Sequence, residues 1–390
     1  MQRTSNNIDR FVRFEPFIVG NFFPKGWESF FDEQVPLLVK QLYSQKEQWK
    51  NKSFSEKDIR FFSRGIIELS NLFSVEDIRK MPGYLSHPRF RSAYLLYFLP
   101  LQAAKFLMLF ELHHNAMKAA IKHGHESGTL RLIDIGAGPG TASIAFLFWL
   151  AGLNCKCCKS LQRIELVWID TSRAIMQDGI ALVELFKKNH PEIKFEISVS
   201  THTVHAEKAR SLIGKNNSLV ILGHVLNEGR HSREFLSEIH DSCHGGGTLI
   251  VEPASKSNSQ YLSKLRNETL PKPLWGPCLH AAICPLTMGR DWCHFSIPAK
   301  IPGKNFSSLS RMLGSERNWL KFSYIWLAAR GTSTRDNALP DRASYRRVVS
   351  DPIKSHNGLH ILLCEPDRVK HMPIQRNTNA ARGSIAIKRG

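Results

Sequence analysis

The stretch LRLIDIGAGPGT, residues 130–141, decides the fold. Its first half, Leu130–Ile135, has the apolar pattern of a short buried β-strand, and an apolar run suited to a helix, Ala142–Leu153, follows the glycines. A glycine-rich turn between a strand and a helix lets a ligand come close to the backbone, and the first turn of the helix offers free N–H groups. The stretch therefore predicts a ligand-binding turn in an α/β sheet.

Strand-like and helix-like segments alternate after this turn. The expected strands are 164–169, 194–199, 218–223 and 248–251, and the expected helices are 171–188 and 232–243. Such alternation indicates βαβ units and a mainly parallel, doubly wound sheet. Two later runs with strand character, Phe322–Ala329 and Leu359–Cys364, are expected to complete this sheet. The polar, Arg-rich segment between them, Thr332–Asn357, is expected to be a loop.

Helical periodicity dominates the sequence before the glycine turn, in 28–43, 58–72 and 90–122. We therefore expect five segments in the chain. They are an N-terminal helical domain over 1–127, a Rossmann-like core over 128–268, a cysteine-rich insertion over 269–300, late strands with the Arg-rich loop over 301–369, and a basic, irregular tail over 370–390.

The composition is that of a globular protein. The 390-residue chain is 42 % hydrophobic and 22 % charged, which suits one or two domains and excludes bulk disorder. Its longest apolar stretch, Leu95–Leu112, is interrupted by Pro100 and Lys105, so we expect no membrane span. Asp9 and Glu15 make the N-terminus unlike a signal peptide, and we expect a soluble intracellular protein.

The net charge of +19 is unevenly distributed along the chain. Residues 300–390 carry 17 Lys and Arg against 6 Asp and Glu, which is more than half of the excess. Clustered cations favour a polyanionic partner because they release counterions from phosphates. Nucleic acid is favoured over a membrane because the sequence has no strongly amphipathic basic helix with an aromatic face. The alternative is a solvated basic surface without a partner.

Two acidic residues accompany the glycine turn. Asp134 precedes the glycines and Asp170 ends the second strand, where carboxylates commonly hold ribose hydroxyls. Ser143 stands at the third glycine position of the dinucleotide fingerprint, and the pattern D-x-G-x-G-x-G instead resembles the first motif of class I S-adenosylmethionine (SAM)-dependent methyltransferases. A turn that only packs helix against sheet is the alternative. The expected SAM-binding residues are Asp134, Gly136, Ala137, Gly138, Pro139, Gly140, Thr141 and Asp170.

The segment after the fourth expected strand, residues 222–228, reads LGHVLNE. It would face the methyl donor, because ligands in this architecture lie beyond the carboxyl ends of the strands. His224 or Glu228 could act as a base there, although a lone His or Glu near a strand end is usually structural. We therefore assign no catalytic residue.

The eight cysteines are clustered and no secretory signal precedes them, which argues against a disulfide framework and suggests a metal. Cys278, Cys284 and Cys293 follow the spacing C-x5-C-x8-C, and Cys364 lies in a later strand-like run. Four thiolates can hold zinc or an iron–sulfur cluster, with His294 as an alternative fourth ligand, and ordinary buried thiols are the other interpretation. A second group is more consistent with an exposed insertion: Cys155, Cys157 and Cys158.

Several motifs occur together in a characteristic order. They are IDIGAGPGTAS, VLNE, IVEP, PC(x5)CP, DWCHFS, KFSY and LCEPD, within residues 85–390. In these motifs the chain resembles the family of methyltransferase-like small-subunit ribosome assembly factors, whose members include yeast mitochondrial ribosomal small-subunit protein 22, human methyltransferase-like protein 17 and bacterial relatives. The cysteine pattern with DWCHF is the specific part of the resemblance.

The resemblance implies a class I SAM-methyltransferase fold with an inserted [4Fe–4S] site, whose ligands would be Cys278, Cys284, Cys293 and Cys364. It also implies binding to the small ribosomal subunit and its rRNA during assembly, and it leaves open whether methyl groups are transferred. Two alternatives remain, a non-catalytic RNA-binding factor with a vestigial SAM site and a zinc-containing methyltransferase for a small molecule or protein. We expect a monomer away from the ribosome, no membrane partner, and a bacterial cytoplasmic location with the mitochondrial matrix as alternative.

Overall fold

The computed structural model describes residues 11–15, 23–44, 53–74, 83–153, 161–226, 233–268, 274–287, 291–298, 300–314, 319–330, 332, 344–356, 358–378 and 380–388. Contacts divide the chain into two units. Unit 1 consists of Met1–Gly20, Val251–Ile297 and Lys321–Gly390, and unit 2 consists of Asn21–Ile250 and Pro298–Leu320. This division cuts across the five segments expected from the sequence, because unit 1 combines the start, the middle and the end of the chain.

A large sheet has the strand order β4-β3-β2-β5-β6-β9-β7, with β8 paired to β9. In unit 2 the strands β2 (Leu130–Ile135), β3 (Arg163–Asp170), β4 (Glu196–Thr203) and β5 (Leu219–Gly223) are parallel. The chain moves outward from β2 to β3 and β4, and then returns to β5 on the other side of β2. Ligands bind at such a reversal, beyond the carboxyl ends of the strands. The expected mixed α/β fold is confirmed.

Four further strands belong to this sheet. They are β6 (Thr248–Glu252), β7 (Leu274–Gly276), β8 (Phe295–Pro298) and β9 (Trp319–Leu327), and β7 pairs antiparallel with β9. The late strand expected at 322–329 therefore does join the large sheet, as β9. The expectation for Leu359–Cys364 is wrong in one respect, because this strand forms but pairs in a different sheet.

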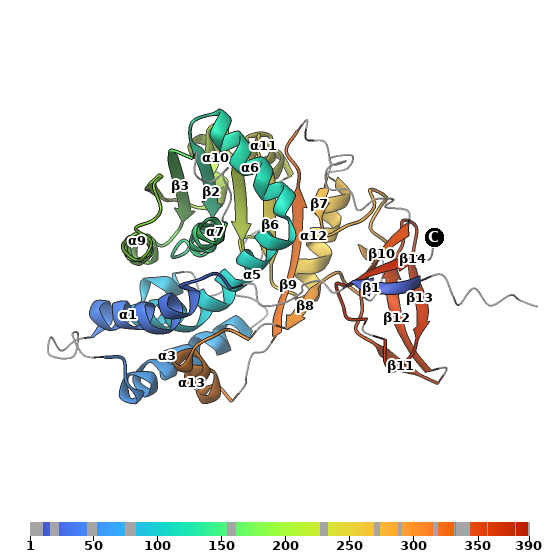
Figure 1. Ribbon diagram of the computed structural model, residues 1–390, viewed down its shortest axis with the longest axis horizontal. Helices are drawn as coiled ribbons and strands as arrows, with labels where there is room; N and C mark the ends of the chain where they lie inside the picture. Colours follow the sequence, from blue (N-terminus) through green and yellow to red (C-terminus); the bar gives the residue numbers. More distant parts are fainter. Residues whose placement is uncertain are drawn as a thin grey trace, which may run out of the picture. The chain divides into compact units, whose positions relative to one another are not determined.

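The second sheet lies in unit 1, and its described strands pair antiparallel. In Figure 1 its first strand, drawn in blue, lies among the red strands from the other end of the sequence. Its core includes Val348, Ile361, Leu363, Met372 and Ala386. The strands, in the order of pairing, are β1 (Phe11–Glu15), β14 (Ile385–Lys388), β10 (Tyr345–Val348), β12 (Gly358–Cys364) and β11 (Ile353–Ser355), with β13 (Val369–Ile374) on β12.

This second sheet corrects three expectations. The segment Thr332–Asn357, expected to be a loop, contains β10 and β11, and the tail 370–390, expected to be irregular, contains most of β13 and all of β14. The N-terminal region, expected to be helical, contains β1. Each strand is short and carries charged residues, so its own sequence shows little alternation. Pairing with distant strands and burial of a few apolar side chains stabilise it instead.

The helices before the glycine turn are packed onto the core within unit 2. The ring of Phe148, on α7 (Thr141–Gly152), lies 5.2 Å from Trp27 and 5.1 Å from Phe30, measured between centroids. The helices of unit 2 include η1 (Ser29–Gln34), α1 (Val35–Tyr43), α3 (Glu56–Ser74), η3 (Tyr84–Ser86), α4 (Pro88–Ala93), η4 (Tyr94–Phe98), α5 (Leu99–Leu112), α6 (His114–Glu126), α7 (Thr141–Gly152), α9 (Arg173–Asn189), η5 (Ala206–Ala209), α10 (Arg210–Ile213), α11 (Arg233–Asp241) and α13 (Lys304–Met312). Those of unit 1 are α12 (Lys256–Glu268) and η6 (Pro285–Thr287).

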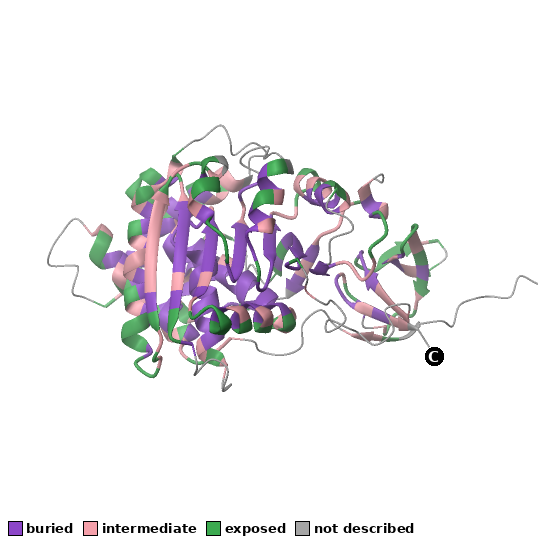
Figure 2. Cartoon of the chain, turned by 90° about the horizontal axis from the view of Figure 1, so that it is seen from above, coloured by how far each residue is buried: buried purple, intermediate pink, exposed green. Residues whose placement is uncertain are grey.

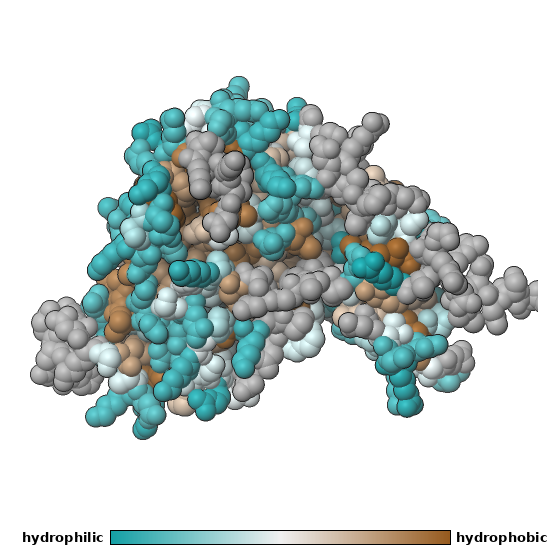
Figure 3. Space-filling model, viewed as in Figure 1, coloured by the Kyte–Doolittle hydropathy of each residue, from teal (hydrophilic) through white to brown (hydrophobic). Residues whose placement is uncertain are grey.

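The core lies in the strands of the large sheet and the helices against them. Figure 2 shows these strands mostly in purple, and the residues of β2 and β5 that point into the core are fully buried. Hydrophilic residues, in teal, cover much of the face seen in Figure 3. Large apolar side chains with high exposure include Phe61, Ile283 and Trp319. Burial of the strand ends is what gives the glycine turn a rigid support.

Within the described residues, one helical run is long and apolar enough to cross a membrane by length and composition alone, and this does not test the expectation that the chain has no membrane span. It is Pro88–Leu112, with 89 % of its apolar window buried inside the protein. Core helices of globular proteins have the same properties. Here the run is continuous from α4 through η4 to α5, and α5 packs against α7.

A single carboxylate links the N-terminal helices to α13. Asp32 accepts hydrogen bonds from the backbone N–H groups of Lys304 (2.8 Å), Asn305 (3.1 Å) and Phe306 (2.8 Å), at the start of α13. These N–H groups have no partner within their own helix. We expect Asp32→Ala to lower the free energy of unfolding by about 2–3 kcal/mol, since a charged cap is lost. Urea denaturation would measure this.

The exposed neighbour Glu33 provides the control, because it lies on the same helical turn. Glu33→Ala is expected to change the urea midpoint very little. Equal midpoints for the two variants would contradict a capping role for Asp32.

Candidate functional site

The glycine turn lies between β2 and α7, at the strand reversal of the large sheet. Gly136, Gly138 and Gly140 have φ values of 70°, 53° and 72°, a region that favours glycine. A Cβ on Gly136 would lie 2.3 Å from a methyl carbon of Val225, and one on Gly140 would lie 2.1 Å from the ring of Trp168. These two glycines are therefore required by packing within the protein.

Gly138 differs from its neighbours, because a Cβ added there would meet nothing within 4 Å. Its N–H donates to Asp170 Oδ2 at 2.9 Å, and Ser172 N–H donates to Asp170 Oδ1 at 2.8 Å. Burial raises the pKa of Asp170 above its usual value, although these backbone bonds oppose the shift. The turn thus holds a carboxylate at the end of β3 beside open space, and these residues fit a ligand with ribose hydroxyls such as SAM.

Asp134 has a different environment from Asp170. It is buried, and its Oδ2 accepts hydrogen bonds from Ser143 N (3.2 Å) and Ser143 Oγ (2.8 Å) in the first turn of α7. Ser143 Oγ also accepts a bond from the indole N–H of Trp168 at 2.9 Å. This network fixes α7 to the strand below it. Asp134 thus stabilises the turn through its bonds to Ser143 in α7. A direct contact between Asp134 and a cofactor stays a prediction.

Asp134 also makes stability depend on pH. Burial raises its pKa from 3.8 to about 7, with the charge of Asp170 adding to the rise and the bonds from Ser143 opposing it. Between these two pH values the folded protein holds a proton that the unfolded chain releases, so the free energy of unfolding falls as pH rises. The slope is at most about 1.4 kcal/mol per pH unit.

Asp134→Asn removes this titration, and Asn is close to the same size. We expect the variant to melt at a higher temperature than the wild type at pH 8 and at a similar temperature near pH 4. Thermal unfolding followed by circular dichroism at both pH values measures the difference. A gap between the two proteins that is the same at both pH values would rule out Asp134 as its source.

His224 follows β5 and has a positive φ of 60°. Its Nε2 lies 3.0 Å from Gln102 Oε1, and burial, with the charge of Lys105, lowers its pKa to about 3. The imidazole is therefore neutral near pH 7 and is a weak base. This environment favours a structural role for His224. Glu228, the other candidate base, lies outside the described residues.

The four expected metal ligands are free thiols in unit 1 and come from four places in the chain. Cys278 follows β7, Cys284 precedes η6, Cys293 precedes β8 and Cys364 ends β12. Burial raises the pKa of Cys293 well above its usual value, and the charges of the other three thiols raise it further. Burial and the same kind of repulsion raise the pKa of Cys364 to about 12. The fold therefore gathers all four sulfurs into one neighbourhood, in which Cys284 is buried and the other three cysteines are half-buried.

These donors are soft and deprotonate when a metal binds, so their chemistry fits zinc or an iron–sulfur cluster. Within the part of the chain that the structure describes, however, no group of three or more His, Cys, Asp or Glu is placed to hold a single metal ion. His294, the alternative ligand, has its Nδ1 3.2 Å from the carbonyl oxygen of Trp292 and stacks on that indole. The thiols are gathered, and a metal centre on them stays a prediction.

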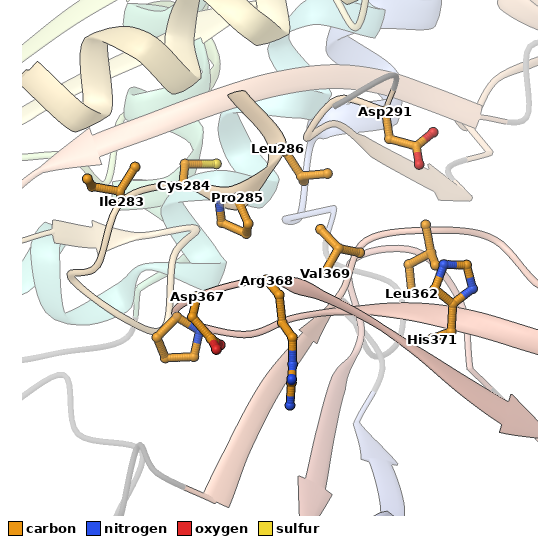
Figure 4. A pocket seen from close by; sticks show the side chains of 11 residues that line it. Ile283, Cys284, Pro285, Leu286, Asp291, Leu362, Asp367, Arg368, Val369 and His371 are labelled. Atoms are coloured by element: carbon orange, nitrogen blue, oxygen red, sulfur yellow. The ribbon is translucent and has the colours of Figure 1, made fainter. Parts of the chain in front are cut away.

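A pocket of about 490 Å³ adjoins this neighbourhood in unit 1. Figure 4 shows Cys284 and Leu286 on one side and Leu362, Val369 and His371 on the other. Cys284, Leu286 and Leu362 also belong to a small apolar cluster against which Cys293 and Cys364 pack. The sulfur neighbourhood is thus shielded by apolar side chains on the side of the second sheet.

A family model described as mitochondrial small ribosomal subunit Rsm22 matches residues 93–381, which include the glycine turn and all four cysteines. The chain belongs to the Rsm22 family. The resemblance seen in the motifs is therefore confirmed. No match among curated proteins was found.

Solved structures similar to this Rsm22-family chain include three methyltransferases. The arsenic(III) SAM methyltransferase of Chlamydomonas reinhardtii is 12 % identical, with a TM-score of 0.31, over 65 % of this chain and 88 % of that one. An O-methyltransferase family protein from Burkholderia thailandensis is 12 % identical, with a TM-score of 0.30, over 70 % of this chain and 71 % of that one. The plantazolicin methyltransferase BpumL, in complex with S-adenosylhomocysteine, is 11 % identical, with a TM-score of 0.29, over 70 % of this chain and 99 % of that one. Similarities this low say nothing about the ligand or substrate of the Rsm22-family chain.

Three residues around the cysteines of this Rsm22-family chain were not anticipated from the sequence. His280 Nε2 lies 3.3 Å from Cys364 Sγ. Arg266 and Arg347 are buried and donate hydrogen bonds to the backbone beside Cys278. The position of His280 two residues after Cys278 is a local signal. The arginines give no such signal, because they are distant in sequence and only the fold brings them there.

Proposed function

We propose that this chain is a SAM-binding, methyltransferase-like factor of the small ribosomal subunit that carries a [4Fe–4S] cluster and binds the subunit's rRNA. The observation that carries the proposal is the Rsm22 match, which covers both candidate sites. The open space beside Gly138, next to Asp170, supports a nucleoside ligand such as SAM. The basic excess of residues 300–390 supports an RNA partner.

In the SAM site, Gly138 leaves room for the ligand and Asp170, held by two backbone N–H groups, is available to ribose hydroxyls. Bound SAM would supply an electrophilic methyl group. The chain's own residues would position this group and exclude water, which is the main contribution available without a base. His224, whose pKa is lowered to about 3 by burial and by the charge of Lys105, is neutral near pH 7 and is a poor candidate for a general base.

In the cysteine site, the proposed ligands are Cys278, Cys284, Cys293 and Cys364. A single zinc ion with Zn–S bonds of about 2.3 Å would need its four sulfurs within roughly 4 Å of one another. A cubane cluster binds each cysteine through a different iron atom and tolerates wider spacing. The match to the Rsm22 family, whose members the cysteine motifs resemble, supports the cluster over zinc. The zinc-containing methyltransferase is the alternative.

The name of the Rsm22 family supports a location in the mitochondrial matrix over the bacterial cytoplasm. We propose that the chain acts there on the small ribosomal subunit, as a monomer when it is not bound to the ribosome and with no membrane partner.

The test begins with anaerobic purification of the full chain, followed by an optical spectrum and analysis of iron, sulfide and zinc. We expect broad absorption near ~400 nm with about four iron and four sulfide per chain, as four-cysteine ligation permits. Zinc without sulfide would favour the alternative.

The second step is a titration of the same protein with small-subunit rRNA at several salt concentrations. A steep fall of log affinity with log salt is expected, because each phosphate contact releases counterions. Weak affinity without salt dependence would overturn the RNA-binding proposal. Incubation of the protein and rRNA with SAM labelled in its methyl group then separates a catalytic factor from a non-catalytic one. Label incorporated at one nucleotide of the rRNA requires catalysis, whereas SAM binding without incorporation supports a non-catalytic assembly factor.

A further inference from the structure

Two arginines are buried beside the four cysteines in unit 1. Arg266, on α12, is 2 % exposed, and Arg347, on β10, is 9 % exposed. Burying a guanidinium group costs several kcal/mol unless it is hydrogen-bonded and its charge is balanced nearby. Hydrogen bonds and nearby negative charge are therefore needed to stabilise these two buried guanidinium groups.

Both side chains clamp the loop that carries Cys278. Arg266 donates to the carbonyl oxygen of His280 at 2.6 Å and also to that of Ala282. Arg347 donates from two nitrogens to the carbonyl oxygen of Pro277, at 3.1 and 3.3 Å. Cys278 thus lies between two backbone carbonyls held by different guanidinium groups.

The second cysteine near these charges is Cys364. Arg347 is directly opposite Cys364 in the antiparallel pairing of β10 with β12, so their side chains share one face of the sheet. The charges of both Arg266 and Arg347 act on the sulfurs of Cys278 and Cys364. The arginines are therefore close to sulfurs drawn from two distant parts of the sequence.

The charges of such a centre can be counted. Four thiolates carry four negative charges, and a [4Fe–4S]²⁺ core or Zn²⁺ returns two positive ones, which leaves two negative charges. Four neutral thiols carry none. Positive charges that act on the sulfurs, as those of Arg266 and Arg347 do, stabilise the negative charge of the loaded centre.

We propose that Arg266 and Arg347 are the counter-charges of the four-cysteine centre and stabilise it as a metal-bound thiolate. This inference rests on the proposed function, because it requires a metal centre at these cysteines. The competing interpretation is that the arginines only hold backbone carbonyls in place. In that case their charge is incidental, and only the shape of the guanidinium group matters.

Substitutions at both positions to Met and to Lys separate charge from shape. Met removes the charge and keeps the length, whereas Lys keeps the charge but loses the planar fork that bonds two carbonyls. We expect Arg347→Met and Arg266→Met to lose about 10- to 100-fold in affinity for the metal centre, the usual effect of losing an outer partner of a metal ligand. The Lys variants should retain the centre more strongly than the Met variants.

The measurements are iron, sulfide and zinc per chain after anaerobic purification, the rate of metal loss to a chelator, and the reduction potential of any cluster. Removal of a nearby positive charge disfavours the added electron, so the Met variants should have a lower potential than the wild type. Arg131→Met is the control, because Arg131 is partly buried and paired with Glu165 in unit 2.

Equal loss of the centre in the Lys and Met variants would overturn the counter-charge role, since shape alone would then matter. Unchanged metal content and potential in all four variants would overturn it as well. If the Met variants do not fold, the Lys variants decide by the same criterion: near-normal metal content supports the proposal, and an empty site contradicts it. A wild-type protein without iron or zinc would instead refute the metal centre itself.

Discussion

Cys293→Ser is expected to yield a protein without its metal centre and with much less soluble material. A serine hydroxyl is a poor ligand for the soft metals that thiolates hold. Cys293 lies between β8 and the rest of the cysteine loop, and its carbonyl oxygen accepts a hydrogen bond from Ser323 Oγ at 2.9 Å on β9. Without the centre, the three remaining thiols and two buried arginines lose the group that holds their segments together. Metal binding at such sites contributes directly to folding.

The measurement is soluble yield together with iron, sulfide and zinc per chain, and the matched control is Cys243→Ser. Cys243 is buried, and its Sγ donates to the carbonyl oxygen of Gly247 at 3.1 Å, a bond that a serine hydroxyl can replace. It lies in unit 2, whereas the four cysteines belong to unit 1. We expect the control to keep both its yield and its metal. Wild-type stability in a metal-free Cys293→Ser protein would refute a structural role for the centre.

Gly138→Ala is expected to weaken SAM binding strongly while the protein still folds. The added methyl group meets no protein atom within 4 Å and would occupy the space that the ligand needs. The positive φ of 53° costs about 1–2 kcal/mol with alanine, which is a modest loss for a buried turn. We expect the dissociation constant for SAM to rise at least tenfold, equal to about 1.4 kcal/mol. Isothermal titration calorimetry measures it.

Gly128→Ala separates this effect from backbone strain. Gly128 has a φ of 77°, also has nothing within 4 Å of its Cβ position, and precedes β2 at the opposite end of the strand from the turn. It should lose similar stability but bind SAM normally. Normal SAM binding by Gly138→Ala would show that the ligand, if bound, does not approach this part of the turn.

The central strands of the large sheet were predictable because each has a recognisable pattern in its own short stretch of sequence. Leu130–Ile135 forms β2 at the expected bounds, since six consecutive residues suited to a buried parallel strand stand directly before three glycines. The need for Gly136 and Gly140 also follows from the turn. The sequence does not show that, of the three glycines in the turn, Gly138 is the one beside open space. This depends on Val225 and Trp168, which fill the space beside Gly136 and Gly140.

The second sheet was not predictable in the same way. Tyr345–Val348 contains two arginines, one of them buried, and looks polar when taken alone. It becomes a strand because it pairs with β12 on one side and β14 on the other. Asp32 is a similar case, since its role depends on N–H groups more than 270 residues away. Contacts at long separation leave no periodic trace in the sequence.

The pairing of Phe11–Glu15 with Ile385–Lys388 has a consequence for biosynthesis. A nascent chain emerges at about 5–20 residues per second, so β1 waits for β14 on the order of tens of seconds. The parallel strands β2–β5 are all synthesised in the interval and can assemble first. Unit 1 is then closed last, after its final strand has left the translating ribosome. The edge of β1, which stays without its partner for that time, is therefore the one that chaperones would need to shield for longest.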